Sequence, residues 1–169
     1  MTRRYEFYIT GSPLLEVPYL FEGAGLPGVY LCNGVTFRDD PEHGHLVSIK
    51  NLPALLQAIA FSVAGRRGPL NGDERRYLRK RIGLSQAALA EKLDIDQQTI
   101  ANYEKGKSKN TGAADFALKM LVIAKLSPDE QVAERLRLLA AEVITNGEMP
   151  ETNVTPAVRG SWASHECRA

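Results

Sequence analysis

The side chains best suited to recognition chemistry in this chain are amides gathered in one short stretch. Gln86, Gln97, Gln98, Asn102 and Lys105 fall on the outer side of predicted helices or at a helix N-terminus. Glutamine and asparagine each offer a donor and an acceptor, which matches the edge of adenine in the major groove of DNA. A helix N-terminus in addition attracts phosphate, because its backbone N–H groups carry partial positive charge. These residue types predict a surface that binds double-stranded DNA.

The charge distribution places a basic segment in the middle of the chain. The net charge is only +1, but residues 66–109 hold eleven Lys or Arg against six Asp or Glu. Residues 1–65 hold four against six, and residues 110–169 hold six against eight. Such a pattern is expected when a single module, rather than the whole surface, meets a polyanion.

The usual residue patterns of enzyme chemistry are missing from the sequence. It has no G-x-x-x-x-G-K, G-x-S-x-G or H-E-x-x-H pattern, and we expect no catalytic residues and no cofactor. His43 and His45 lie near Asp39, Asp40 and Glu42, a grouping that could hold a metal. Histidines at alternate positions in a polar loop are more often ordinary surface residues than metal ligands, so we expect no metal site.

The composition is that of a soluble globular protein, with 44% hydrophobic and 24% charged residues in a chain of 169. Cys32 and Cys167 lie far apart and outside any C-x-x-C pair, so we expect two free thiols. No apolar run approaches the roughly 18 to 20 residues that span a bilayer, and no signal peptide is evident. We expect a cytoplasmic protein without a membrane partner.

The first 50 residues predict a small antiparallel sheet, because short apolar runs alternate with Gly, Pro and Asp. Asn33-Gly34 is a strong signal for a two-residue hairpin turn, since both residues tolerate the positive φ of a type I′ turn. A helix is expected after Asn51, with Pro53 in its first turn. The predicted strands are Tyr5–Ile9, Tyr19–Glu22, Val29–Cys32, Val35–Phe37 and Leu46–Ile49.

Beyond a basic, glycine-bearing break at residues 65–69, the sequence predicts helices only. Asn71 and Glu74 predict a capping box at the start of the first of them. Ser85 and Asp96 predict the caps of two further short helices. Only two residues separate these two helices, which forces a sharp angle between them.

A fourth helix of this region is expected after Thr111 and a fifth from Ser127. The fifth carries an apolar stripe at coiled-coil spacing, which predicts either a dimer contact or packing onto its own domain. Residues 147–169 lack periodicity and predict a disordered tail. The stripe consists of Val132, Leu136, Leu139 and Val143.

The two short helices carry the contact pattern of a helix-turn-helix. Branched apolar residues occupy the positions where two steeply crossing helices meet, and Ala90 allows close approach. The run LSQ-x-x-LA-x-x-L-x-I-x-x-x-T-I-x-x-Y-E-x-G-K resembles the Cro and phage-repressor family of helix-turn-helix proteins, often called the XRE family, over residues 72–125. The apolar positions are Leu84, Leu89, Leu93, Ile95 and Ile100.

The resemblance implies DNA-contacting roles for the matching positions. Gln97, Gln98 and Asn102 match base-reading positions, and Thr99 matches a contact with the DNA backbone or a thymine methyl. Gln86 matches the start of the positioning helix, where the glutamine meets a phosphate or supports a reader.

The same resemblance implies supporting roles for the other matching residues. Glu104 matches an acid that pairs with an arginine of the first helix, here Arg79, to hold the geometry. Lys107 and Lys109 match a loop that approaches the DNA backbone, and Asp94 replaces the glycine that the family usually has in the turn.

The expected fold class is therefore α+β. A small N-terminal antiparallel sheet with one helix, at residues 1–66, precedes an all-α five-helix helix-turn-helix domain at residues 70–146, followed by the tail.

The N-terminal runs GLPGVYLCNGV and GHLVSIKNL look like the N-terminal module of regulators allied to MqsA-type antitoxins. Zinc-binding members carry cysteine pairs there; this chain has only Cys32, so zinc is not implied. Two functions remain open. One is a homodimeric repressor on a palindromic operator, and the other is an antitoxin that binds a toxin through its N-terminal domain and autoregulates its operon.

Overall fold

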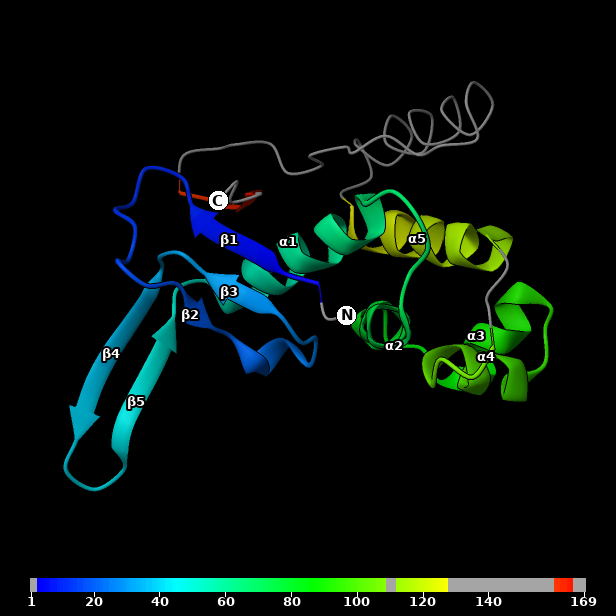
Figure 1. The fold of residues 1–169 in the computed structure, drawn as a ribbon, viewed down its shortest axis with the longest axis horizontal. Coiled ribbons are helices and arrows are strands. Elements are labelled where there is room, and N and C mark those ends of the chain that lie inside the picture. Colours follow the sequence, from blue (N-terminus) through cyan, green and yellow to red (C-terminus); the bar gives the residue numbers. More distant parts are fainter. Residues whose placement is uncertain (1–2, 109–111, 128–159, 166–169) are drawn as a thin grey trace. The chain divides into compact units, whose positions relative to one another are not determined.

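The protein, described by a computed structural model, has the α+β class that the sequence predicts (Figure 1). Strands dominate its N-terminal part, five helices follow within the described residues, and one more strand lies near the end. None of the described helices is long and apolar enough to cross a membrane. The residues that the structure describes are 3–108, 112–127 and 160–165.

The chain divides into two compact units. The first draws on residues 1–59 and 155–169, and the second on residues 60–154. Helix α1 (Leu52–Gly65) contains the point of division. The domain limits predicted at residues 66, 70 and 146 stay predictions.

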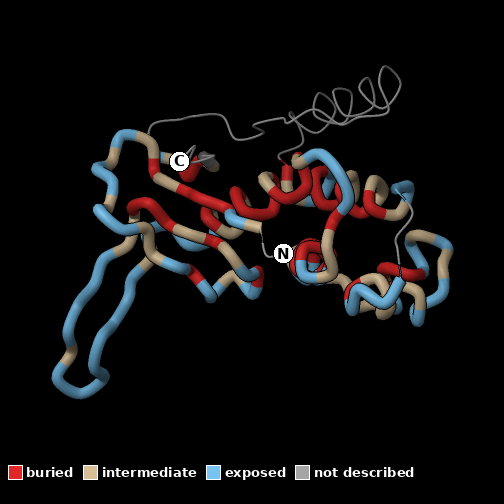
Figure 2. Tube along the Cα trace, in the orientation of Figure 1, coloured by how far each residue is buried: buried red, intermediate tan, exposed pale blue. Residues whose placement is uncertain are grey.

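A four-stranded sheet lies in the first unit. Its strands, in spatial order, are β2 (Tyr19–Leu20), β3 (Val29–Leu31), β1 (Tyr5–Ile9) and β6 (Trp162–His165), with a 3-10 turn at Glu22–Ala24 between β2 and β3. The β2–β3 pair is antiparallel, as predicted, and so is the β1–β6 pair, although no strand was predicted at β6. Strands β1 and β3 are parallel, which differs from the antiparallel sheet that was predicted. A parallel pair needs a long crossover, and the stretch that contains β2 provides it. Figure 2 shows the burial of β1 and β3, which form the core of this unit.

A separate two-stranded hairpin consists of β4 (Val35–Asp40) and β5 (Gly44–Ile49). The hairpin turn predicted at Asn33-Gly34 is wrong, because β3 and β4 lie in different sheets and the hairpin turn lies between Asp40 and Gly44. Asn33 is instead 2% exposed. Its amide accepts from the Ile9 N–H at 2.6 Å and donates to the Ile9 carbonyl at 3.1 Å, so it ties the link after β3 to the end of β1.

The prediction of a disordered tail is wrong at β6. Trp162–His165 forms an edge strand against β1, although the sequence around it shows no periodicity. Four residues are too few for a period to be visible, and the strand is specified by its distant partner. The other residues of the predicted tail, apart from Gly160 and Ser161, lie outside the described part.

The second unit contains α2 (Gly72–Arg81), α3 (Gln86–Leu93), α4 (Gln97–Glu104) and α5 (Gly112–Leu126). The three predicted caps are confirmed. Asn71 and Glu74 form the capping box of α2, with N···O distances of 2.9 and 2.7 Å. Ser85 caps α3 and Asp96 caps α4. The predicted fifth helix, with its apolar stripe, lies outside the described residues.

Candidate DNA-binding surface

The turn between α3 and α4 sets the angle of the two helices. Asp94 adopts the left-handed conformation, with φ 52° and ψ 46°, in the position where glycine is usual. The Ile95 N–H bonds to the Ala90 carbonyl at 3.0 Å, which closes the turn. Leu89, Ala90 and Ile100 are at most 4% exposed. Aspartate tolerates this conformation better than most residues, so the turn forms without glycine.

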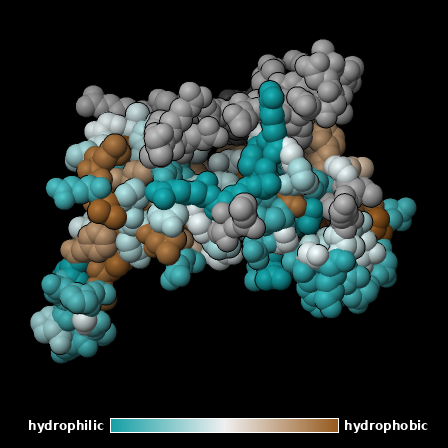
Figure 3. Space-filling model, in the orientation of Figure 1, coloured by the Kyte–Doolittle hydropathy of each residue, from teal (hydrophilic) through white to brown (hydrophobic). Residues whose placement is uncertain are grey.

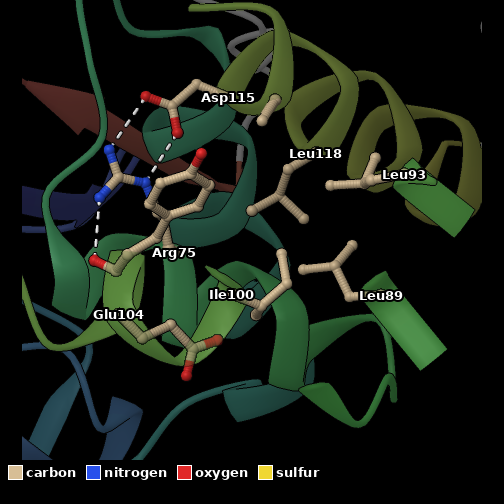
Figure 4. Close-up of a pocket in the computed structure, with 9 residues that line it drawn as sticks. Arg75, Leu89, Leu93, Ile100, Glu104, Asp115 and Leu118 are labelled. Atoms are coloured by element: carbon tan, nitrogen blue, oxygen red, sulfur yellow. Dashed lines mark hydrogen bonds and ion pairs between the residues drawn. The ribbon is translucent and has the colours of Figure 1, made fainter. Parts of the chain in front are cut away.

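Apolar side chains from three helices meet beneath the turn. Figure 4 shows Leu89 and Leu93 of α3, Ile100 of α4 and Leu118 of α5 lining one small pocket. Burial of such side chains contributes about 1.5–3 kcal/mol each. This core fixes α4 against α3 and α5, so the outer residues of α4 project from a rigid base.

The outer face of α4 carries the predicted readers. Gln97 and Gln98 are exposed, whereas Thr99 and Asn102 are half-buried. Asp96 accepts from the Gln98 and Thr99 N–H groups at 2.7 and 3.3 Å, which fixes the start of the helix. Gln98 Nε2 donates to Asn102 Oδ1 at 3.2 Å, so these two amides form a pair one turn apart. The surface over α3 and α4 is mainly hydrophilic in Figure 3.

Glu104, the last residue of α4, joins three elements. Arg79 of α2 donates to its carboxylate through Nε and Nη2, at 2.5 and 2.9 Å. Gln86, at the start of α3, donates to the same carboxylate at 2.9 Å. Arg79 also donates to the Leu84 carbonyl at 2.9 Å. The structure thus brings together the predicted pair of Arg79 and Glu104 and adds Gln86, which here supports the end of α4.

The environment of Glu104 makes its ionised form the favoured one. Burial raises the pKa of Glu104, but hydrogen bonds from Arg79 and Gln86 and the charges of Arg79 and Arg76 together outweigh it. The pKa is therefore held below its ordinary value.

We predict that the stability of the helical unit falls in acid through Glu104. A carboxyl with a depressed pKa in the folded state stabilises fully above its unfolded pKa, about 4.3. That contribution is lost as the pH falls through the lower folded pKa. Urea unfolding followed by circular dichroism should show this loss below about pH 4. E104Q should have a lower free energy of unfolding than the wild type at pH 7, and that free energy should change less as the pH falls. Parallel pH profiles of the free energy of unfolding for the two proteins would contradict the prediction.

A second buried ion pair, which was not predicted, begins one turn earlier on α2. Arg75 donates to Asp115 of α5 through Nε and Nη2, at 2.8 and 3.2 Å, and to the Tyr103 carbonyl at 3.1 Å (Figure 4). Asp115 also accepts from the Leu70 N–H at 3.0 Å. One turn further along α5, Lys119 donates to the carbonyls of residues 66 and 68 at 2.6 and 3.1 Å. The sequence does hold one signal for these buried charges, because Asp115 and Lys119 interrupt the otherwise apolar stretch of α5.

Close backbone packing supports the same arrangement. Gly72 begins α2, and a Cβ on it would lie 2.3 Å from the Glu104 carbonyl oxygen. Glycine is therefore required for α2 to approach the end of α4 so closely.

The remaining predicted residues lie at the edge of this surface or elsewhere. Lys105 and Lys107 are exposed just after α4, and Lys109 lies outside the described residues. In the other unit, His43 bonds to Asp40 at 3.0 Å and His45 bonds to Asp39, in two exposed pairs at the end of the β4–β5 hairpin.

Comparison with known proteins bears on the helical unit. A family model described as helix-turn-helix matches residues 76–112, from α2 to the first residue of α5. No curated protein and no solved structure matches the chain. The match covers the crossing helices, the turn and the residues after α4 that the geometry above singles out. Residues 76–112 are therefore a DNA-binding helix-turn-helix of the Cro and phage-repressor, or XRE, type.

Proposed function

We propose that this protein is a transcriptional repressor that binds a palindromic operator as a homodimer and reads it with α4. The observation that carries the proposal is the two-sided character of α4. Its outer face offers Gln97, Gln98 and Asn102, while its end is held by the buried pair of Arg79 and Glu104. A helix that is rigid on one side and amide-rich on the other is suited to the major groove.

The contacts divide into those that specify sequence and those that position the protein. Gln97, Gln98, Asn102 and Thr99 are the proposed base contacts. Even with the bond between Gln98 and Asn102 in place, Gln98 keeps an acceptor and a donor and Asn102 keeps two donors. Lys105, Lys107 and Lys109 are the proposed phosphate contacts, since lysine neutralises phosphate without reading bases.

The homodimer follows from the size of one module. A single small DNA-binding module buries about 600–1,000 Å² and gives limited specificity, whereas two modules on half-sites about one helical turn apart double the contact. The predicted stripe from Val132 to Val143 is one proposed dimer element, and the first unit is the other. Mass in solution with and without operator DNA measures the stoichiometry.

The proposal is tested by selecting bound fragments from genomic DNA and titrating the preferred one by fluorescence anisotropy at several salt concentrations. We expect a preferred palindromic site and an affinity that falls steeply with salt, because each neutralised phosphate releases counterions. A protein that prefers no fragment over bulk DNA would not be a sequence-specific regulator.

Variants then separate readers from positioning residues. Q97A, Q98A and N102A should each cost about 1–3 kcal/mol on the selected site and little on nonspecific DNA, whereas K107A should weaken both alike. K92A is the matched control, because Lys92 is an exposed lysine at the end of α3 and is not among the proposed contacts. Equal losses on both DNAs for the amide variants would remove α4 from the role of reading helix.

A second function, that of an antitoxin, is favoured by the surface of the first unit. Phe37 and Val47 are paired across the β4–β5 hairpin, yet they are 58% and 41% exposed. Leu14 and Val17 are 66% and 78% exposed, and hydrophobic surface is visible over this unit in Figure 3. Exposed apolar surface is typical of protein-binding sites. A neighbouring reading frame whose expression alone stops growth, and whose product binds this protein, would favour the antitoxin.

A further inference from the structure

The sheet of the first unit is completed by residues from the far end of the sequence. Strand β6 pairs with the edge of β1, with Trp162 opposite Ile9 and Ser164 opposite Phe7. The pairing continues beyond the strands, because the Thr10 N–H bonds to the Ser161 carbonyl at 3.2 Å and the Gly160 N–H bonds to the Thr10 carbonyl at 3.0 Å. Residues 160–165, here called the Trp162 segment, therefore bind β1 mainly through backbone groups.

A shaped slot receives the tryptophan of this segment. Trp162 is only 2% exposed, and its indole N–H donates to the Lys50 carbonyl at 2.9 Å. The ring lies against Gly34, where a Cβ would be 2.7 Å from Trp162 Cη2 and 2.6 Å from Ile9 Cδ1. Gly34 also has a φ of +72°, which disfavours other residues. Glycine thus leaves the space that the indole ring fills.

These contacts define the kind of peptide that fits. Backbone pairing to a strand edge supplies affinity without sequence preference, and pockets for alternate side chains supply specificity. The pocket here takes an indole and offers a carbonyl to its N–H group. The next residue, Ala163, is 6% exposed opposite Tyr8, so that position favours a small side chain. An extended segment with tryptophan followed by a small residue meets these requirements.

The segment comes from far along the sequence, because 149 residues separate Thr10 from Gly160. A ligand carried on the same chain as its site binds at a raised effective concentration. We propose that the β1 edge and the Gly34 slot form a binding site for a tryptophan-bearing extended peptide, and that the Trp162 segment is its reversibly bound intramolecular ligand. This inference does not depend on the proposed DNA-binding function.

The test uses the full chain and its only tryptophan. W162A removes the indole from the protein, so a synthetic peptide of residues 158–166 becomes the sole source of tryptophan fluorescence. We expect saturable binding with emission moving to shorter wavelength as the indole enters the slot. The matched control is W162A combined with G34V, in which the added side chain blocks the slot and the peptide emission should stay unchanged.

The wild-type chain provides the competition arm. Its own segment fills the site, so a dye-labelled peptide should bind it at least about tenfold more weakly than it binds W162A. W162F serves as a second host, since a phenyl ring partly fills the slot and maintains the fold if W162A does not. Circular dichroism shows which of these variants keeps the wild-type fold. If that variant does not bind the peptide, the proposal is overturned. Equal binding of the peptide by the G34V control would also overturn it. Operator binding is measured on the same samples, so that a failure of peptide binding can be told apart from a failure of the proposed repressor function.

Discussion

Replacing Arg79 with methionine should lower the free energy of unfolding of the helical unit by about 3–5 kcal/mol. The variant leaves the Glu104 carboxylate buried after it has lost both of its close guanidinium hydrogen bonds. The remaining Gln86 bond and the more distant Arg76, at 3.8 Å, cannot replace them. Urea unfolding followed by circular dichroism measures the change, and operator affinity should fall with it, since α4 loses its anchor.

Two further variants show whether the loss comes from an unpaired buried charge. R76M removes an arginine of the same helix that is 44% exposed, and it should cost less than about 1 kcal/mol. The double variant R79M/E104L removes both charges and should recover much of the lost stability, as apolar replacements of buried ion pairs often do. A loss for R76M equal to that for R79M, or a double variant as unstable as the sum of its parts, would contradict this account.

The second large effect is expected at Asp115. D115L leaves the Arg75 guanidinium buried without its carboxylate and removes the acceptor of the Leu70 N–H group. Loss of one partner from a buried pair costs about 3–5 kcal/mol, so the helical unit should be strongly destabilised in the same urea assay.

Conservative and surface variants serve as its controls. D115N keeps one acceptor oxygen and the shape of the side chain, so its free energy of unfolding should fall less than that of D115L. D73N, at an exposed position in the first turn of α2, should change stability by less than about 1 kcal/mol. If D115L proved as stable as D73N, the ion pair with Arg75 would not hold α2 to α5.

Features coded by neighbouring residues could be predicted from the sequence. The caps at Asn71, Ser85 and Asp96 each depend on a side chain and an N–H group two or three residues away. Strand β1 has the predicted limits, because aromatic and β-branched residues fill four of its five positions. The helix-turn-helix was recognisable for the same reason, since its contacts fall within one short run.

Features that depend on distant partners could not be predicted. Asn33 has the composition of a hairpin turn, but its amide bonds to Ile9, 24 residues away, and that contact decides its role. The buried pair of Arg75 and Asp115 joins residues 40 apart, so a charge within the apolar stretch of α5 does not by itself show which residue it pairs with. The proposed base-reading residues rest on residue type and spacing and stay predictions, whereas the bond from Gln86 to Glu104 is visible only once the helices are packed.

The return of the Trp162 segment to β1 also sets an order of events during protein synthesis. A ribosome releases α2 to α5 before residue 160, so the helical unit has all of its described elements while the first sheet still lacks one strand. Until translation reaches His165, β1 presents an open edge with Phe7 and Ile9 beside it, which is the kind of edge that pairs with other chains. A nascent chain that stalls between the two stages would therefore carry helices α2 to α5 complete, together with a sheet in which the β1 edge is still unpaired.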